Sequence, residues 1–443
     1  MVDKEDTSGA FVPKDVDTEP FKKRLTQVET DLKGIESLDT RYARNVARRE
    51  VWRDNELLLM DLEEAGVIEE GKMESEWQKK NLEIRRQLTI EPLSLEMNGP
   101  NKAFMFARAL GMFIWCFGGL WILFLCSPLR WLHPALRRFG VPNDYLPIDL
   151  LVTVVANGLV RCSGAVPTVQ GLETREYPPP QPYLTMFAHP SNLDPMVLLR
   201  TSPVIHKGVG KQSLFMIPVI GWAFRFAMGS IPLDRGSRKR AVAQLDRLKA
   251  SMQRWRRCLT IAPEGTRQPQ GQLQPFKKGA FHLQHDLGCP VAPVVHFGPF
   301  ELWPRNRMMN APGHVTIRYM PLVYPDKGAD HNQVRRQVRR LMLEESCKDV
   351  PKDAGTTLTD SETRSVHFSI ALTVVLGLIE LWITYVVTSI AFGSWSLLSL
   401  CMFVSSCFVA LEFAVYFGLN LPTSGQIVDK LTGHDAAATI LMK

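Results

Sequence analysis

A histidine and an aspartate lie five residues apart in a segment that follows a short apolar run. The run Tyr183 to Phe187 is typical of a buried strand, and Ala-His-Pro-Ser-Asn-Leu-Asp-Pro comes directly after it. Because residues five apart lie on different faces of a helix, His189 and Asp194 can meet only if a turn follows the strand and a helix begins near Pro195. The carboxylate would then orient the imidazole, whose other nitrogen would take a proton from a hydroxyl group. For an isolated pair, a strand-end histidine and a helix-capping aspartate are the commoner interpretation.

A second apolar run, Leu259 to Ala262, leads into the sequence Pro-Glu-Gly-Thr-Arg at 263–267. The glycine lets the backbone approach a ligand closely at Gly265, and the planar guanidinium of Arg267 matches the oxygens of a phosphate. This segment therefore indicates a phosphate-binding turn after a strand.

Two further segments add cations next to expected secondary structure. Lys277 lies in Phe-Lys-Lys-Gly-Ala-Phe before an apolar helix, and Arg235 ends a third short strand at 229–235. A fourth buried run, 291–295, follows a polar helix. One histidine–acid pair with several cations at strand ends favours chemistry on the hydroxyl group of a phosphorylated substrate.

The elements that must position these residues form an α/β pattern. Residues 165–325 alternate short β-rich runs with amphipathic stretches, and 145–160 reads as a short apolar helix that packs on them or on a membrane face. We therefore expect one α/β catalytic domain over 145–345, built as a mixed sheet with surrounding helices.

One apolar stretch precedes this domain. The uncharged run 109–129 reaches the length of about 20 residues that a membrane span needs, so we expect a membrane helix over 103–132. Its glycines and Pro128 equally permit a bent helix that enters and leaves one leaflet, and the basic residues on both sides do not decide between the two.

The C-terminal region contains two more apolar runs. Residues 366–392 and 395–419 predict two helices that form a transmembrane hairpin over 366–419. Each helix holds one acid, Glu380 and Glu412, for which a polar partner on a neighbouring helix or an interfacial position is the simpler interpretation and a functional role the other.

The rest of the chain divides by composition. Residues 1–20 are acidic and contain prolines, which predicts disorder, and 21–100 is charged and helix-favouring, with an apolar stripe typical of a helical hairpin. We expect a linker at 350–364 and a tail at 420–443. Four arginines form a basic helix face, interpreted as solvated or as a contact for lipid headgroups: Arg335, Arg336, Arg339 and Arg340.

Composition and motifs exclude several classes of protein. The chain has 443 residues and a net charge of +7, and its 8 cysteines form no Cys-x-x-Cys pair, so a zinc ribbon or a thioredoxin-like motif is not expected. The cysteine usage favours a reducing compartment for the soluble parts. The Gly-x-Ser-x-Gly, P-loop and His-Glu-x-x-His patterns of serine hydrolases, nucleotide hydrolases and zinc proteases do not occur.

The remaining histidines suggest no second centre. His282 and His285 lie three apart on an expected helix, but no third ligand follows at a suitable spacing, so we expect no metal site. Three others are interpreted as structural or solvent-facing: His206, His296 and His314.

Residues 183–321 resemble the phospholipid/glycerol acyltransferase family, particularly the 1-acylglycerol-3-phosphate acyltransferases. The four motifs of the family occur in order, as His189 with Asp194, the strand ending on Arg235, Pro-Glu-Gly-Thr-Arg at 263–267, and Val-Ala-Pro-Val-Val at 291–295. The Phe-Lys-Lys-Gly-Ala-Phe extension is also present, whereas Ala188 and Pro190 depart from the polar residues common in the family.

The resemblance implies an acyltransferase-type fold and transfer of an acyl group from acyl-CoA, as co-substrate, to the sn-2 hydroxyl of lysophosphatidate, without another cofactor. It implies His189 as the general base and Asp194 as its orienting residue. It also implies residues that bind the glycerol phosphate of the acceptor: Arg235, Glu264, Gly265, Thr266 and Arg267. We add Lys277 to this binding set.

Other interpretations stay open at this stage. Within the enzyme class they are an acyltransferase for glycerol-3-phosphate or lysophosphatidylcholine and a tafazzin-like transacylase. Outside it, the chain would be a membrane scaffold whose helical arm, 21–95, recruits a protein partner. We expect acyl-CoA, lysophospholipid and a lipid bilayer as partners, no nucleic acid, and an endoplasmic-reticulum-like membrane with the catalytic domain facing the cytosol.

Overall fold

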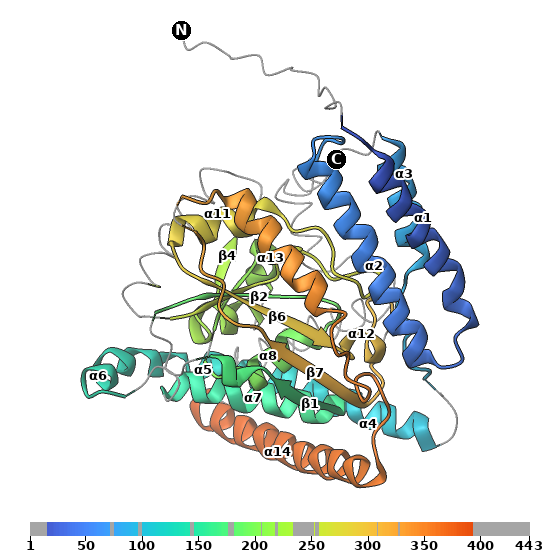
Figure 1. Ribbon diagram of the computed structural model, residues 1–443. Helices are drawn as coiled ribbons and strands as arrows, with labels where there is room; N and C mark the ends of the chain where they lie inside the picture. Colours follow the sequence, from blue (N-terminus) through green and yellow to red (C-terminus); the bar gives the residue numbers. More distant parts are fainter. Residues whose placement is uncertain are drawn as a thin grey trace.

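The computed structural model describes residues 16–70, 75–95, 100–141, 146–175, 181–204, 206–217, 220–233, 252, 257–307, 309–326 and 328–392. Within these residues the chain forms one central sheet with helices on both faces and a group of N-terminal helices at one side (Figure 1). The expectation of a mixed α/β sheet with surrounding helices is confirmed.

The sheet has seven strands in the order β1-β7-β6-β2-β5-β3-β4. Every neighbouring pair is parallel except β6 with β7, which is antiparallel. Central strands β2 and β6 are buried along their whole length, which explains their continuous apolar sequence. The strands, in chain order, are β1 (Ala165–Gln170), β2 (Leu184–Phe187), β3 (Lys207–Lys211), β4 (Ile231–Leu233), β5 (Leu259–Ile261), β6 (Val291–Phe297) and β7 (Gly313–Tyr319).

Alternate residues of each central strand pack against different helices. On one face, Leu184 and Met186 join a cluster with residues of α11 (Lys278–Leu287) and α13 (His331–Glu345). On the other face, Phe187 packs in a cluster with residues of α4 (Pro100–Ile114), α7 (Pro147–Ser163), α8 (Asp194–Thr201) and α14 (Asp360–Phe392). Figure 1 shows α4, α7 and α14 together on that side of the sheet.

Short helical segments connect these elements. They are η1 (Ile35–Ser37), η2 (Trp115–Gly119), α5 (Leu120–Leu125), η3 (Ser127–Leu132), α6 (His133–Arg138), η5 (Leu172–Thr174), η6 (Gln212–Met216), α9 (Ile220–Trp222), η7 (Ala223–Ala227) and α12 (Pro299–Leu302). The η2 segment is a π-helical turn in which Trp115 packs onto Gly158 of α7, where an added Cβ would lie 2.0 Å from the indole ring.

The charged N-terminal region folds into α1 (Glu19–Gly34), α2 (Arg41–Glu64) and α3 (Glu76–Gln87), with α1 packed against α2. Its apolar stripe does not form a separate core. Leu25 and Val28 of α1 belong to the same buried cluster as the sheet residues that contact α13. The arm is therefore packed onto the α/β domain through a continuous core, beside α13 in Figure 1.

The arginines of α13 pair with acids of this arm. Arg339 contacts the fully buried carboxylate of Glu56, which also pairs with Arg85 of α3. Burial alone would raise the pKa of Glu56, but the two guanidinium groups hold it below its ordinary value. The other pairs are Arg335–Glu70, Arg336–Glu64 and Arg340 with Asp61 and Glu64. The arm thus buries Arg335 and Arg339, for which the solvated interpretation is wrong, while the side chains of Arg336 and Arg340 stay 35% and 33% exposed beside their acidic partners.

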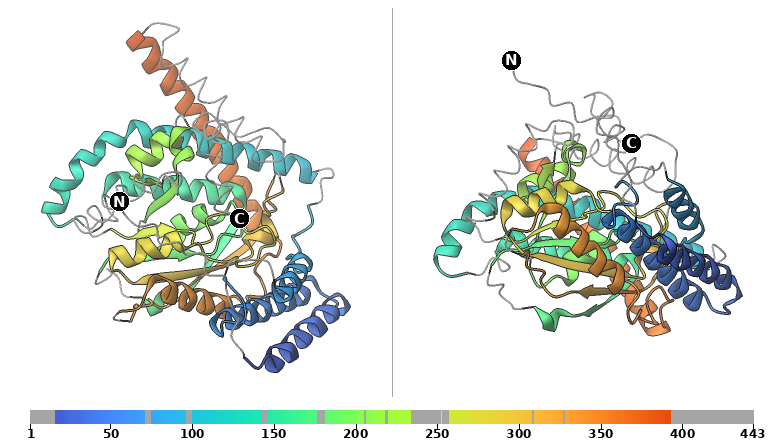
Figure 2. Two further views of the ribbon diagram at one scale, coloured as in Figure 1. Left: turned by 90° about the horizontal axis from the view of Figure 1, so that it is seen from above. Right: turned by 45° about the horizontal axis from the view of Figure 1, so that its top comes forward.

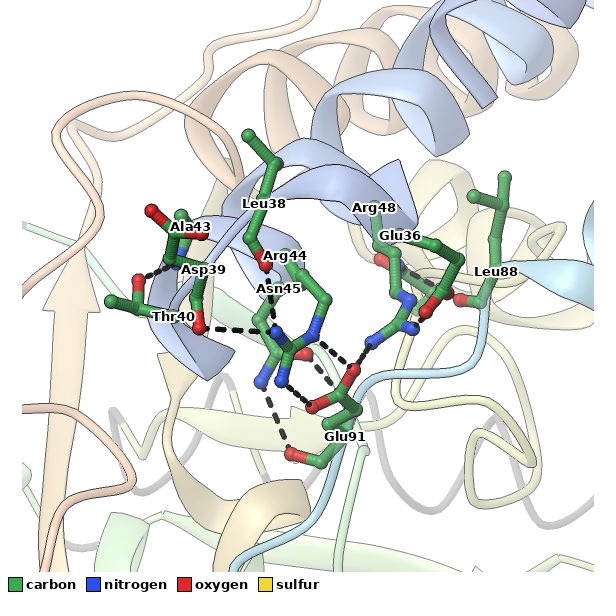
Figure 3. Close-up of polar contacts among 11 residues, drawn as sticks. Glu36, Leu38, Asp39, Thr40, Ala43, Arg44, Asn45, Arg48, Leu88 and Glu91 are labelled. Carbon is green, nitrogen blue, oxygen red and sulfur yellow. Dashed lines mark hydrogen bonds and ion pairs between the residues drawn. The ribbon is translucent and has the colours of Figure 1, made fainter. Parts of the chain in front are cut away.

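A clasp around Glu91 fixes the extended segment that leaves the arm (Figure 3). The carboxylate of Glu91 accepts from Nε of Arg44 at 2.7 Å and from Nη1 of Arg48 at 2.6 Å. Asn45 bonds both the backbone N–H and the carbonyl of the same residue. Since Arg44, Asn45 and Arg48 all lie on α2, the segment 88–93 is held to that helix by side chains and main chain together.

Two described helical stretches are long and apolar enough to cross a membrane, Asn101–Leu125 and Asp360–Ile379. The first is 44% buried within the protein and the second 17%, so the start of α14 is the more exposed of the two. Figure 2 shows the far end of α14 projecting beyond the helices that it contacts. The second helix of the expected hairpin, 395–419, with Glu412, lies outside the described residues, as do Arg235, 1–15 and the tail.

Candidate active site

The two motif-bearing segments meet at one edge of the sheet. Strands β2 and β5 are parallel neighbours, with Leu184 opposite Leu259 and Met186 opposite Ile261. The carboxyl ends of parallel neighbours lie side by side, and His189 follows the first strand while 263–267 follows the second. In open α/β sheets this edge is where ligands bind.

His189 and Asp194 face each other across the turn between β2 and α8. Nδ1 of His189 lies 2.9 Å from Oδ2 of Asp194, which also accepts the backbone N–H of Ser191 at 2.7 Å. Helix α8 begins at Asp194 and has Pro195 in its first turn, as the turn-and-helix prediction required. The Asp194 side chain has no exposed area, whereas 19% of His189 is exposed. The imidazole therefore reaches the surface over a buried acid.

A second imidazole lies on the other side of the same carboxylate. Nδ1 of His296, on β6, is 3.5 Å from Oδ1 of Asp194, and the His296 side chain is fully buried. Burial raises the pKa of Asp194, but His189 and His296 together hold it below its ordinary value. The sequence interpretation of His296 as a structural histidine left out this contact; the signal was its position directly after the buried run 291–295.

The carboxylate of Glu264 forms its hydrogen bonds with groups of the protein itself. It accepts the backbone N–H of His189 at 3.0 Å, the backbone N–H of Gln274 at 3.0 Å and the side-chain amide of Gln268 at 2.8 Å. The Glu264 residue is 2% exposed, and burial raises its pKa to about 7 against the three donors that lower it. This geometry makes Glu264 a brace for the His189 main chain, and its expected contact with an acceptor stays a prediction.

Gly265 and Arg267 lie on the outer side of the same turn. Gly265 has φ +70°, and an added Cβ would lie 2.9 Å from Cδ of Lys277, so the glycine lets that lysine fold across the turn. The guanidinium of Arg267 bonds the side-chain oxygen of Asn192, between His189 and Asp194. Thr266 is exposed. The structure thus brings Gly265, Arg267 and Lys277 beside the histidine–acid turn.

The N-terminal arm supports the loop behind this turn. The indole N–H of Trp52 donates to the carbonyl of Leu273 at 3.0 Å, and the backbone N–H of Ile90 donates to the carbonyl of Gln270 at 2.9 Å. The same loop supplies Gln268 and Gln274 to Glu264. Sequence patterns did not identify Asn192, Gln268, Gln274 or Trp52. Each of them contacts a residue that is distant in sequence or outside any local motif, so no pattern of neighbouring residues predicts the contact.

No group of three His, Cys, Asp or Glu side chains arranged to hold a metal ion occurs in the described ranges. The cationic side chains near the turn, Arg267 and Lys277, instead suit a phosphate. The arrangement can take a proton from a hydroxyl at the exposed imidazole and place an anionic group beside it.

Comparisons with known proteins show which family this part of the chain resembles. Residues 167–296 match the family described as Acyltransferase. The chain is 38% identical over 117 residues to a 1-acyl-sn-glycerol-3-phosphate acyltransferase of Saccharomyces cerevisiae, covering 26% of this chain and 38% of the relative. It is 37% identical over 138 residues to a chloroplastic one of Brassica napus, covering 31% of this chain and 38% of the relative.

The chain thus spans about 38% of the length of these two relatives. The crystal structure of a 1-acyl-sn-glycerophosphate acyltransferase from Thermotoga maritima is similar with a TM-score of 0.41 and 20% identity, covering 54% of this chain and 96% of that one. Residues 167–296 are thus similar to the Acyltransferase family, and this part of the chain resembles the 1-acyl-sn-glycerol-3-phosphate acyltransferases.

Proposed function

We propose that the protein transfers a fatty acyl group from acyl-CoA to the sn-2 hydroxyl of lysophosphatidate, which gives phosphatidate. The observation that carries the proposal is the exposed imidazole of His189 held by the buried Asp194, with Arg267 bonded into the same turn. This geometry supports the proposal of a general base with a phosphate-binding cation on the neighbouring turn, after β5.

His189 would act through Nε2, because Nδ1 faces Asp194. The acceptor oxygen attacks the thioester carbonyl carbon while its proton moves to Nε2. The new C–O bond forms, the C–S bond breaks, and the imidazolium returns the proton to the CoA thiolate. Asp194 stabilises the imidazolium that forms between these steps and fixes the tautomer that precedes them.

The glycerol phosphate of the acceptor would bind along the outer side of the turn at 263–267. Arg267 and Lys277 supply positive charge there, Thr266 an exposed hydroxyl, and Gly265 the space for close approach. Arg235 completes the set that the resemblance implies. Glu264 would contribute indirectly, by holding the main chain of His189.

The surface opposite the arm suits attachment to a lipid bilayer. Large apolar side chains are exposed on α4, η3, α7 and the first half of α14, among them Phe106, Trp131, Leu150 and Phe368. Both proposed substrates carry acyl chains and reside in or at a lipid bilayer. An apolar surface of this kind would hold the enzyme where it can reach them. We propose an integral membrane protein of an endoplasmic-reticulum-like membrane, with the catalytic domain facing the cytosol. A protein partner for 21–95 stays a prediction, and the described contacts of these residues with α13 and 268–274 support a structural role first.

Acyl transfer by the purified, detergent-solubilised protein tests the reaction. Labelled long-chain acyl-CoA would be offered with lysophosphatidate, glycerol-3-phosphate or lysophosphatidylcholine. We expect phosphatidate from the wild type and a loss of about 10²–10⁴-fold in His189→Ala, the usual effect of removing a general base. His285→Ala changes an exposed histidine of α11 and should retain full activity.

The acceptor panel ranks the alternatives. Preference for another acceptor would reassign the headgroup and keep His189 as the base. Folded protein that is silent on every acceptor would contradict the proposal and favour a tafazzin-like transacylase, tested with a phospholipid donor, or a scaffold.

A further inference from the structure

The two oxygens of the Asp194 carboxylate have different surroundings. Oδ2 has two donors, Nδ1 of His189 and the backbone N–H of Ser191. Oδ1 is buried and has no hydrogen-bond partner among the described residues. A buried carboxylate oxygen without a donor is costly, so the group that faces it decides how firmly the carboxylate is held.

The group that faces Oδ1 is the imidazole of His296. Its Nδ1 lies 3.5 Å away, and within the described part of the chain neither of its ring nitrogens has a hydrogen-bond partner. The two unsatisfied atoms therefore face each other in a fully buried space. One N–H···O bond satisfies both of them after a closure of about 0.6 Å, given the usual N–H···O length of about 2.9 Å.

The sheet fixes this arrangement. Phe187 of β2 pairs in register with Val294 of β6, so His296 lies two residues further along β6 on the face that Phe187 occupies. The Phe187 ring contacts both imidazoles, with centroid distances of 5.5 Å to His189 and 5.9 Å to His296. Both histidines are thus placed by neighbouring strands around one acid.

We propose that His296 is a positioning residue, whose Nδ1–H donates to Oδ1 of Asp194 and keeps Oδ2 directed at His189. This proposal rests on the proposed function for its effect on the reaction. With both oxygens held, the carboxylate is prevented from rotating. The titratable groups around this carboxylate in the described residues are His189, His296 and, after β5, Glu264.

Two variants separate the donor from the packing. His296→Asn retains an N–H donor near the Nδ1 position, whereas His296→Leu has nearly the same shape as Asn but no donor. We expect kcat to fall about tenfold in the Leu variant, the effect of one hydrogen bond to a charged group, with the KM for acyl-CoA unchanged. The pH profile of kcat/KM should change in the Leu variant. The Asn variant should retain most of kcat and the wild-type profile.

Equal behaviour of the Leu and Asn variants, with unchanged pH profiles, would overturn the proposal and leave His296 as a packing residue. The protonation state of His296 can also be measured in the wild-type protein. In histidine-labelled protein, nitrogen chemical shifts should show His296 protonated at Nδ1, and protonation at Nε2 alone would overturn the proposal.

The same spectra separate this proposal from the proposed function. The Nδ1 chemical shift of His189, identified by its loss in His189→Ala, should differ between the Leu variant and the wild type and be the same in the Asn variant as in the wild type. Absence of acyl transfer would overturn the function, while the tautomer of His296 and the Nδ1 shift of His189 would still decide the role of His296.

Discussion

The backbone N–H of His189 donates to Oε1 of Glu264 across 3.0 Å, which joins the first and third motifs through the main chain of the expected base. Because the bond involves the main chain, it survives replacement of the imidazole. His189→Ala therefore removes the base without releasing the turn, which makes loss of activity in that variant a specific result.

Glu264→Gln should remove a pH dependence of stability. Burial raises the pKa of Glu264 to about 7 from an ordinary value of 4.5. Between these values the folded protein keeps a proton that the unfolded chain has released, so this group makes the free energy of unfolding fall as the pH rises through that window. Glutamine has no such proton. Denaturant unfolding at intervals across the window should show a flatter pH dependence in the variant, and parallel curves would contradict the prediction.

Gly265→Ala should impair the phosphate-binding turn. The residue has φ +70°, where alanine costs about 1–2 kcal/mol, and the new Cβ would press on the Lys277 side chain. We expect a lower melting temperature and a higher KM for lysophosphatidate. Gly279→Ala is the matched control, since an added Cβ there meets nothing within 4 Å. If the melting temperature and the KM for lysophosphatidate were the same in Gly265→Ala and Gly279→Ala, the prediction of a tight turn at Gly265 would be wrong.

Trp52→Phe should loosen the loop that supports Glu264. The indole of Trp52 is 1% exposed and donates to the carbonyl of Leu273 at 3.0 Å. Phenylalanine retains most of the packing but leaves that buried carbonyl unpaired, at a cost of about 1–3 kcal/mol. Hydrogen exchange by mass spectrometry should show faster exchange in 268–274. Trp131→Phe, at a side chain that is 84% exposed, should leave exchange in this loop unchanged; equal effects of the two variants would refute a local role for Trp52.

Glu91→Gln should weaken the clasp in a pH-dependent manner. Hydrogen bonds from Arg44 and Arg48 lower the pKa of Glu91 to about 2. The ionised carboxylate therefore contributes stability above its ordinary value of 4.5, and this contribution is lost as the pH falls through about 2. Unfolding experiments should find the variant less stable than the wild type at pH 7, with the difference shrinking toward pH 3. Glu19→Gln removes an exposed i,i+3 pair with Lys22 and should have little effect at either pH.

Local patterns in the sequence predicted the elements that carry the chemistry. The apolar run before His189 and the proline after Asp194 are consequences of a strand and a helix start, so both could be placed from nearby residues. The direction of the Glu264 carboxylate could not, because it depends on three donors from two separate segments, the turn after β2 and the loop 268–274. The packing of the arm against the α/β domain could not be predicted either. Trp52 and Leu273 are 221 positions apart, and neither lies in a sequence motif.

The separation between the arm and its contacts also has a consequence during synthesis. Glu56 pairs with Arg339, which lies 283 residues later in the chain. At about 5–20 residues per second, the ribosome needs roughly 15–60 s to add that stretch. Throughout this interval the apolar stripe of the nascent arm has no complete α13 to pack against, while the first apolar candidate span, Asn101–Leu125, is made and the second, Asp360–Ile379, has yet to be synthesised. A holdase chaperone that binds the emerging arm would therefore raise the yield of folded protein.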